Sequence, residues 1–421
     1  MNMHEIYNDN YLKCQYKLSN FIIEAATISG KDAIEIAKNE ITLKVAKYIL
    51  NKYNIEELNF FKSLSIQKKD EIYDIEMQID SYKPFKEPLR FKFLSMNTTI
   101  SNKICILRKY EEFIRLSPFS SEYSKLNKWI STVYQLPLGV YRELNYNSTI
   151  SEFLNNIRNG LDKNIYGHNE TKEQIIRILA QYISNPNAKG YVIGIQGSMG
   201  VGKTKFIKDG IAKVIEYPLA FIALGGISDS SYLKGHSYTY EGSTFGKIVE
   251  QLIKTKVMNP IFFFDELDKV SNTRHGEEII NTLIHITDPV QNDKFSDKYF
   301  EEIDLDLSKS LIIFTYNDEN AINPILKDRM ITIKVAGYNS KQKLSICRDY
   351  IIPELLPQYN MQKNDIIFDE QLLKNIIETH GKEEGVRNLK RVINDIISWI
   401  NMIRYVPMDG IQVKFPFHVS C

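Results

Sequence analysis

The feature that most constrains this chain of 421 residues is a glycine-rich segment near its middle, Gly197-Ser198-Met199-Gly200-Val201-Gly202-Lys203-Thr204. It follows an apolar run, Tyr191 to Gln196, that is typical of a buried strand, and it precedes a helical pattern. A glycine-rich turn in this setting directs backbone N–H groups and the positive end of the helix toward phosphate oxygens. The spacing is that of a P-loop, in which Lys203 reaches the β and γ phosphates and Thr204 ligates Mg²⁺. We therefore predict that residues 197–204 bind ATP with Mg²⁺.

A second apolar run ends in two carboxylates. Residues 260–264 are continuously apolar and precede Asp265-Glu266, as in a fully buried central strand. Adjacent acids at the carboxyl end of such a strand are costly unless a cation faces them. We therefore assign Asp265 to the Mg²⁺ shell and Glu266 to the base that polarises the attacking water, with an ordinary surface turn as the alternative.

Three further polar residues are candidates because each lies next to a predicted strand or helix. The apolar run Leu311 to Thr315 leads to Asn317, a candidate sensor of the γ-phosphate if this strand lies beside the other two. A single Asn after a strand is usually a turn residue, so its order after the two motifs is what makes it a candidate. Arg329 precedes another strand-like run, and Arg387 begins a later helix. Lone arginines are mostly solvated, but ring-forming ATPases keep a charge-stabilising finger and a lid sensor at these places.

The order of apolar segments predicts the architecture. Strand-like runs alternate with helix-length stretches between residues 191 and 335, which predicts a mainly parallel α/β sheet wrapped by helices. These runs are Tyr191–Gln196, Pro218–Leu224, Ile261–Phe264, Leu311–Thr315 and Ile331–Val335. Beyond Tyr338 the pattern is helical, which predicts a small all-α domain.

The region before the P-loop module is predicted to be mostly helical. Apolar residues recur at three and four between Ile34 and Tyr48, and Ile104 to Leu116 is again helical in pattern. Between them, Leu89 to Phe93 alternates apolar and basic residues, as a half-buried strand does. We predict three domains: residues 1–116, of unknown role; 117–338, the nucleotide-binding α/β domain with its leading helices; and 339–421, the all-α domain with a short tail.

Charge and cysteine content narrow the possible partners. The chain has 53 Lys and Arg against 52 Asp and Glu, a net charge of +1, which argues against whole-chain attraction to nucleic acid or anionic membrane. The four cysteines form no C-x-x-C pair, and no apolar run reaches the ~18 residues of a membrane span. No targeting segment is visible, so we expect a soluble protein of the cytoplasm. Abundant Asn, Ile, Lys and Tyr suggest an AT-rich genome; for a viral chain the location is the host cytoplasm.

The chain resembles the AAA+ module of Lon proteases from about Ser117 to Arg404. The strings that carry the resemblance stand in family order: Ser117-Pro118-Phe119-Ser120-Ser121-Glu122-Tyr123, Tyr166-Gly167, Leu224-Gly225-Gly226, Thr239-Tyr240, Asp265-Glu266-Leu267-Asp268-Lys269, Asp288-Pro289-Val290-Gln291-Asn292, Phe295-Ser296-Asp297, Asp306-Leu307-Ser308, Asp328-Arg329-Met330 and Gly385-Val386-Arg387.

The resemblance implies a fold and a set of roles. The fold is a P-loop AAA+ module with a five-stranded parallel sheet and an all-α lid. Asn317 is implied as sensor 1, Arg329 as a finger acting on a neighbour's nucleotide and Arg387 as sensor 2. Tyr166-Gly167 is implied as part of the adenine pocket. The family also implies a homo-oligomeric ring, taken as a hexamer, that works in protein quality control.

The departures from the family shape the expected function. Full Lon proteins continue past the lid into a peptidase domain, whereas this chain stops at Cys421. No Ser-Lys dyad follows, and none of the seven histidines lies in H-E-x-x-H, so we expect no peptide-bond cleavage by this chain. Tyr240 keeps the aromatic that grips a threaded polypeptide, but Glu241 stands where the family has an aliphatic residue. Met199 replaces a P-loop proline.

These observations favour an ATP-hydrolysing ring that unfolds, translocates or remodels protein substrates. An alternative is the ATPase component, or a truncated chain, of a Lon-like protease whose peptidase lies elsewhere. A third possibility, a scaffold that nucleotide orders without hydrolysis, is disfavoured because Glu266, Asn317, Arg329 and Arg387 are all present. A nucleic-acid motor is disfavoured because the charge is balanced and no basic aromatic surface is evident.

Overall fold

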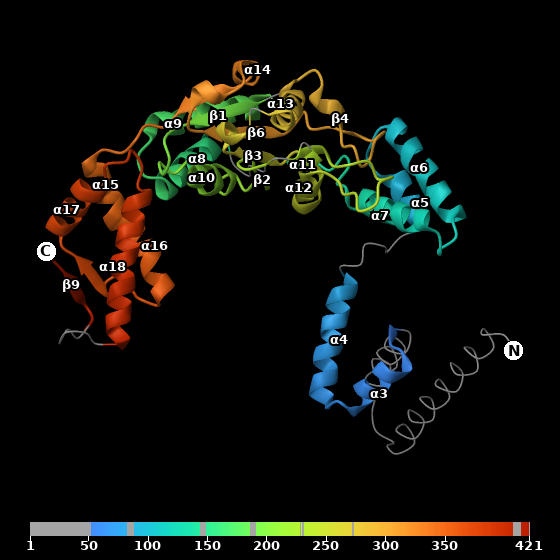
Figure 1. Cartoon of the computed structure of the whole chain (residues 1–421), viewed down its shortest axis with the longest axis horizontal. Helices are drawn as coiled ribbons and strands as arrows, with labels where there is room; N and C mark the ends of the chain where they lie inside the picture. The colour runs from blue at the N-terminus through green and yellow to red at the C-terminus, as the bar shows by residue number, and fades with distance from the viewer. Residues whose placement is uncertain are drawn as a thin grey trace. The chain divides into compact units, whose positions relative to one another are not determined.

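The computed structural model describes residues 52–81, 88–143, 149–185, 191–227, 229, 231–271, 273–406 and 414–420. The chain divides into two compact units, Met1–Lys86 and Glu87–Cys421 (Figure 1). In the first unit the described helices are α3 (Ile55–Ser63) and α4 (Ile66–Ser81), in keeping with the helical prediction; the predicted stripe from Ile34 to Tyr48 lies outside the described residues. Among the described helices, none combines the length and apolar character that crossing a bilayer requires.

The second unit is built around a parallel sheet of five strands in the order β2-β3-β6-β1-β7. The strands are β1 (Val192–Gln196), β2 (Leu219–Ala223), β3 (Ile261–Asp265), β6 (Leu311–Tyr316) and β7 (Ile331–Lys334). They confirm the five strands expected from the sequence and their parallel arrangement. Register pairs Gln196 with Tyr316 and Ala223 with Asp265, so the segments that follow β1, β3 and β6 emerge at one edge.

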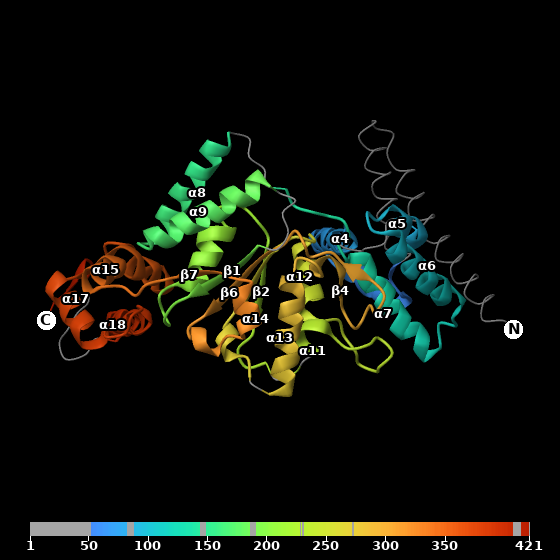
Figure 2. The same ribbon diagram turned by 90° about the horizontal axis from the view of Figure 1, so that it is seen from above.

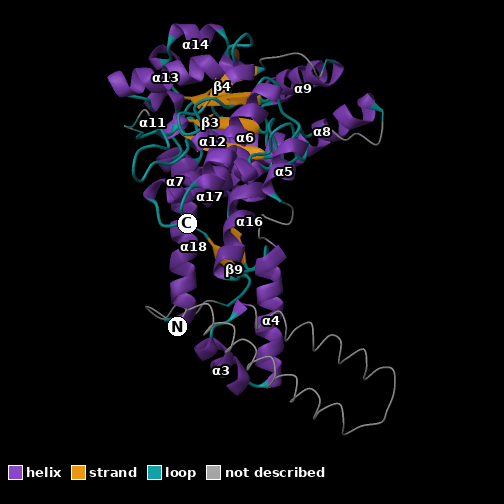
Figure 3. Cartoon of the chain, turned by 90° about the vertical axis from the view of Figure 1, so that its right-hand side faces the viewer, coloured by secondary structure: helices purple, strands orange, loops and turns teal. Residues whose placement is uncertain are grey.

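Both faces of the sheet are buried, which explains the continuous apolar character of its central strands. Phe263 and Ile313 face the core with α8 (Ile150–Asn164), α9 (Asn169–Ser184) and the π-helical segment Phe206–Ala212. Phe262 and Phe264 face the opposite core, which α12 (Lys247–Thr255) and α13 (Arg274–Thr287) cover. Figures 2 and 3 show helices on either side of the strands. The remaining elements of the α/β part are α10 (Lys203–Lys205), α11 (Ser231–Lys234), β4 (Phe295–Ser296), β5 (Asp304–Leu305), α14 (Pro324–Asp328) and short 3₁₀ turns at Leu267–Lys269, Asn292–Lys294 and Glu319–Ala321.

The helices that precede the sheet belong to the same packed unit. They are α5 (Leu89–Ser95), α6 (Ile100–Arg115) and α7 (Ser121–Gln135), and they lie at one end of the sheet layer in Figure 1. Their buried residues Phe93, Ile106 and Trp129 share one core with the sheet. The predicted boundary between residues 116 and 117 lies within the unit Glu87–Cys421, and the predicted division into domains stays a prediction.

The predicted strand at Leu89–Phe93 is wrong, because this segment forms α5. Pro88 occupies the N-cap, and Phe93 and Met96 are both buried in the shared core, against which Leu89 packs. The spacing of Leu89, Phe93 and Met96, four and three residues apart, places the three side chains on one helical face. Alternation over five residues matched a strand, but the next apolar residue, Met96, continues the helical period.

The C-terminal part forms a small helical domain with its own core. It contains α15 (Ser340–Ile346), a π-helical segment (Cys347–Ile351), α16 (Ile352–Leu355), a 3₁₀ turn (Leu356–Tyr359), α17 (Glu370–His380) and α18 (Arg387–Tyr405). This agrees with the helical prediction for the region. One feature was not predicted: β8 (Ile366–Phe368) and β9 (Phe417–Val419) form a short parallel pair. The C-terminal segment therefore packs against the helical domain that precedes it.

Candidate nucleotide site

The P-loop connects β1 to α10 and folds around the ammonium group of Lys203. Two of its glycines need left-handed backbone angles, with φ of 80° at Gly200 and 92° at Gly202, which side chains rarely tolerate. The Lys203 Nζ donates to the carbonyls of Gly197 and Ser198, the second at 3.0 Å. Burial lowers the pKa of Lys203, while the nearby carboxylates of Asp265, Asp268 and Glu266 act in the opposite direction. The ammonium therefore stands among acceptors and acids at the carboxyl edge of the sheet.

Asp265 is the last residue of β3, and hydroxyl groups from two other elements lie against its carboxylate. The Thr204 hydroxyl approaches one oxygen at 3.4 Å, and the Thr315 hydroxyl donates to the other. Thr315 is fully buried in β6 and pairs with Ile195 of β1, so the strand pairing fixes its position. The carboxylate and the Thr204 hydroxyl offer the oxygen ligands that Mg²⁺ prefers, and Mg²⁺ typically takes only one or two protein ligands beside phosphates and water. These residues therefore fit the predicted metal site.

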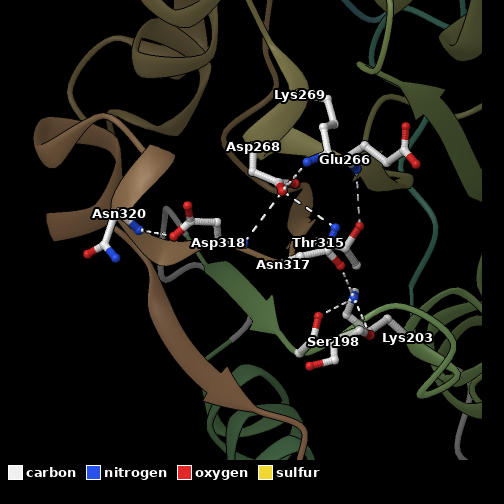
Figure 4. A network of polar contacts seen from close by, with 10 residues as sticks. Ser198, Lys203, Glu266, Asp268, Lys269, Thr315, Asn317, Asp318 and Asn320 are labelled. Atoms are coloured by element: carbon white, nitrogen blue, oxygen red, sulfur yellow. Dashed lines mark hydrogen bonds and ion pairs between the residues drawn. The ribbon is translucent and has the colours of Figure 1, made fainter. Parts of the chain in front are cut away.

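Asn317 directly follows β6 and joins the P-loop to a buried acid (Figure 4). Its amide oxygen accepts a hydrogen bond from the Lys203 ammonium at 2.7 Å, and its amide nitrogen lies 3.4 Å from the Asp268 carboxylate. The Asp268 side chain is 0% exposed and also pairs with Lys269 at 3.1 Å. Asp268 thus orients the amide so that its oxygen faces the lysine.

Glu266 has an unusual backbone and a side chain directed away from Lys203 (Figure 4). Its φ of 61° lies in the left-handed region, which costs on the order of 1 kcal/mol for a residue with a side chain. The carboxylate lies against the loop after β2: a Cβ on Gly225 would stand 2.1 Å from Glu266 Oε2. Only glycine at 225 leaves room for this position of the predicted base.

The lid contacts the P-loop directly. Arg387 is the first residue of α18 and lines a cleft of about 360 Å³. The same cleft is lined by Lys203, Asp265, Glu266 and Asn317. The Val386 amide donates to the Gly200 carbonyl at 3.1 Å, and the Ser198 hydroxyl donates to the Glu384 carboxylate. The predicted sensor 2 is therefore held beside the phosphate loop by backbone and side-chain contacts.

Tyr166 and Gly167 join α8 to α9, and they lie where the lid meets the P-loop. The Tyr166 ring contacts the lid residue Tyr350 edge-on, with centroids 5.9 Å apart. Next to them, His168 Nε2 lies 2.7 Å from the Tyr338 hydroxyl, which in turn approaches the Val201 carbonyl at 3.1 Å. Burial lowers the pKa of His168, so its ring is neutral near pH 7.

Arg329 lies outside the cleft that the other predicted residues form. It caps α14, and its guanidinium donates to the Ile284 carbonyl at 2.6 Å and to the Asp288 carboxylate at 3.0 Å. Its side chain is 27% exposed. Arg329 does not line this cleft, and its predicted action on a neighbour's nucleotide stays a prediction.

Comparison with known proteins agrees with this geometry. Residues 193–337 match the ATPase family associated with various cellular activities (AAA), and residues 358–402 match the Lon protease AAA+ ATPase lid domain. The chain contains a Lon-type AAA+ module. A Lon protease homolog of Acanthamoeba polyphaga mimivirus is 35% identical over 373 residues, which cover 86% of this chain and 36% of that protein. The Lon protease of Clostridioides difficile (strain 630) is 32% identical over 376 residues, which cover 89% of this chain and 46% of that protein.

A third relative, the Lon protease of Mycoplasma genitalium, is 33% identical over 83% of this chain and 41% of its own length. The chain thus spans about a third to a half of the length of these relatives. The matched ranges fall within the predicted α/β and lid regions of the Lon-type module, and the exact boundary at 338/339 stays a prediction.

The predicted pore-loop residues lie apart from the nucleotide cleft of the Lon-type module. Tyr240 and Glu241 belong to the segment between α11 and α12, and neither lines the cleft. Tyr240 is 69% exposed, an unusual state for a large aromatic side chain. Its position is compatible with contact to a substrate, and its role stays a prediction.

Several residues of the site were not assigned roles from the sequence. Asp268 stood within a recognised string without a function of its own, and Thr315 was counted only as the end of an apolar run. The sequence gave no indication of a role for His168, Tyr338 or Glu384. The site residues that their side chains contact are far away along the chain. Thr315 could have been found, since it is the one polar residue in Leu311–Thr315.

Proposed function

We propose that this Lon-type AAA+ module hydrolyses ATP in a homo-oligomeric ring, taken as a hexamer, to unfold, translocate or remodel protein substrates. The observation that carries the proposal is the convergence of Lys203, Asp265, Glu266 and Asn317 on one cleft at the carboxyl edge of the sheet. When bound, Mg²⁺ would supply positive charge that offsets the negative charge of the phosphates. Thr204 and Asp265 would hold it.

The remaining residues of the cleft supply positioning and charge. Lys203 and Arg387 would place positive charge along the phosphate chain, and Asn317 would present its amide to the γ-phosphate. Glu266 would orient a water molecule and accept its proton. For that step its carboxylate must turn from Gly225 toward the cleft, a rotation that the side chain can make about its own bonds.

The position of Arg329 supports a ring. Its guanidinium lies outside its own cleft and partly exposed, as a group offered to a neighbouring subunit would be. Fingers supplied in trans raise rates by ~10³ to 10⁵ in other nucleotide hydrolases. Hydrolysis by the ring should therefore depend on assembly.

The exposed Tyr240 supports action on polypeptides. An aromatic ring at the tip of a loop can pack against any unfolded chain, because such contact needs apolar area and no particular sequence. We further propose a cytoplasmic location, which the unpaired and buried thiols of Cys105 and Cys347 support.

The relationship to peptide cleavage is a separate question. The relatives are Lon proteases, and the chain spans about a third to a half of their length. We propose that this chain is the motor and does not itself cleave peptide bonds, so a peptidase would be provided on another polypeptide or segment. Incubating casein with the protein and ATP, followed by gel electrophoresis, tests this point: casein should stay intact.

The ATPase rate of the purified chain, with and without unfolded casein, tests the motor itself. The matched control is Glu266→Gln, which keeps the size of the side chain and its contact with Gly225 but removes the base. We expect a measurable rate that casein raises and that Glu266→Gln abolishes. Nucleotide binding without hydrolysis would overturn the motor proposal and favour the scaffold.

A further inference from the structure

Two lysines of α7 donate hydrogen bonds to the backbone of the loop that carries Tyr240. Lys125 Nζ donates to the Thr239 carbonyl at 2.9 Å, and Lys128 Nζ donates to the Ser243 carbonyl at 2.8 Å. The two lysines are three residues apart, and side chains at this spacing lie on the same helical face. Their ammonium groups therefore bracket the tip of the loop, residues 239–243, from one side.

The base of the same loop is closed by close backbone contact. His236 N donates to the Thr244 carbonyl at 3.1 Å, and the Gly246 amide donates to the Asp297 carboxylate at 2.8 Å. Glycine is required on both sides of this closure, since a Cβ on Gly235 would stand 2.6 Å from the Thr244 carbonyl oxygen and one on Gly246 would stand 2.1 Å from that of Leu233. The base is thus fixed without the lysines.

A third lysine secures the residue two positions before the exposed ring. Lys109 of α6 donates to the Tyr238 hydroxyl at 2.6 Å and lies 4.8 Å from the centre of the Tyr238 ring. The buried Trp129 of α7 packs near the same ring, with centroids 6.5 Å apart. Helices α6 and α7 therefore contact the loop before and after Tyr240 along the chain, at Tyr238, Thr239 and Ser243, while Tyr240 itself is exposed.

The lysines contribute more to the order of the loop tip, residues 239–243, than to that of the residues where the loop closes, because the hydrogen bonds within the tip are long. Inside the loop, the Tyr240 amide donates to Ser237 at 3.2 Å and the Ser243 amide donates to Tyr240 at 3.4 Å, both long for backbone hydrogen bonds. Gly242, with φ of 76°, adds a position of high backbone freedom. Hydrogen bonds that involve a charged group are stronger than those between neutral groups. The Ser237 hydroxyl donates to the Glu301 carboxylate at 2.7 Å and holds the residues before the tip, so the two lysine contacts should contribute most to the order of residues 239–243.

We propose that Lys125 and Lys128 are positioning residues that hold Tyr240 in the orientation needed to grip a polypeptide. Neither lysine needs to touch the substrate or the nucleotide. The inference rests on the proposed function, in which Tyr240 contacts the substrate. It also gives α6 and α7 a role, because any movement of these helices would pass directly to the loop.

The test compares Lys125→Met, Lys128→Met and the double variant with Lys254→Met. Methionine keeps most of the length of the side chain and removes its hydrogen bonds. The Lys254 side chain on α12 is exposed and makes no hydrogen bond or ion pair with any described residue, so its variant controls for loss of a positive charge. Arginine at 125 and 128 serves as the conservative variant, because it can still donate to a carbonyl.

We expect the double variant to keep its basal ATPase rate and melting temperature, and to need about fivefold more casein for half-maximal stimulation, a change typical of losing charge-assisted hydrogen bonds. The arginine variant should recover most of this loss. Stimulation equal to that of the wild type would overturn the inference. So would an equal fall in basal and stimulated rates together with a lower melting temperature, which indicates a purely structural role.

A direct measurement of the loop separates this inference from the proposed function. A nitroxide label at Tyr240→Cys, in a background of Cys14→Ser and Cys421→Ser, reports local mobility by electron paramagnetic resonance. Cys105 and Cys347 are buried, and burial raises the pKa of both thiols, so they should resist labelling. The label should become more mobile in the double methionine variant. Increased mobility without any casein stimulation in the wild type would keep the positioning role and overturn the proposed function. Unchanged mobility would overturn the inference.

Discussion

The Lys203 ammonium donates to the Asn317 amide oxygen at 2.7 Å and so links the P-loop after β1 to the end of β6. The same amide reaches Asp268 through its nitrogen, at 3.4 Å. Asn317 therefore stands between the Lys203 ammonium and an acid that fixes the orientation of the amide. This arrangement gives Asn317 a position from which it can respond to the γ-phosphate that Lys203 would bind.

Replacing Asn317 with alanine should reduce ATP hydrolysis more than nucleotide binding. The loss of one oriented polar group at a transition state typically lowers kcat by about 10²-fold. Steady-state kinetics and binding of a fluorescent ATP analogue measure the two effects. Asn320→Ala is the matched control, because the Asn320 side chain is exposed and points away from Lys203 (Figure 4). Equal rates in the two variants would contradict the role of Asn317.

Gly225 leaves room for the Glu266 carboxylate to rest outside the position in which it would act as a base. A methyl group on residue 225 would stand 2.1 Å from Glu266 Oε2, at the flexible end of that side chain, and would displace the carboxylate from this place. Because the proposed base must turn away from Gly225 to act, we expect Gly225→Ala to keep kcat at the wild-type level or raise it by at most about a few fold, while ATP affinity changes little. A double variant with Glu266→Gln should hydrolyse no more slowly than Glu266→Gln alone. A further loss in the double variant would show that Gly225 acts elsewhere.

Arg329 and Glu266 should complement each other between subunits. Arg329 lies outside its own cleft, so in a ring it would serve a neighbour, whereas Glu266 lines the cleft of its own chain. Arg329→Ala and Glu266→Gln should each be nearly inactive, with losses on the order of 10³-fold for a missing finger. Mixing the two proteins should restore part of the ATPase rate, because a Glu266→Gln subunit supplies Arg329 to an intact base next to it. No recovery on mixing, despite mixed rings seen by native mass spectrometry, would place both residues in one subunit's site.

The sequence predicted those parts of the structure that depend on local patterns. The five strands are short apolar runs between helical segments, and Asp265, Glu266 and Asn317 follow them directly, so parallel pairing alone brings them to one edge. The P-loop is similarly local. Its glycines and Lys203 stand within eight residues.

Parts of the structure that depend on distant contacts were not predictable in this way. Leu89–Phe93 became a helix because its apolar face packs into a core formed with residues far along the chain. The contact of Glu384 with Ser198 needs the lid to fold back on the P-loop, 186 residues earlier. The pair β8–β9 likewise joins a tail to a strand about 50 positions before it, and neither segment has a strong pattern. In each case, tertiary packing decided what the local sequence left open.

Asp297 should make stability depend on pH in a specific direction. It is 0% exposed, and burial raises its pKa to about 7, although the amides of Tyr299 and Gly246 and the charge of Lys234 favour the ionised form. Between the ordinary carboxyl value of 3.8 and about 7, the folded protein keeps a proton that the unfolded chain has lost. The free energy of unfolding contributed by this group therefore falls as pH rises through that window and is level above it. The whole change is at most about 4 kcal/mol, at ~1.4 kcal/mol for each pKa unit.

Asp297→Asn removes this titration and keeps the size of the side chain. The melting temperature of the wild type minus that of the variant should therefore decrease between pH 5 and pH 7.5, and stay constant from pH 7.5 to pH 8.5. Differential scanning fluorimetry of both proteins across this range measures the difference, and other titrating groups cancel because the two chains share them. A difference that increases with pH would mean that the N–H donors of Gly246 and Tyr299 outweigh burial, so that Asp297 is ionised when it holds the base of the Tyr240 loop.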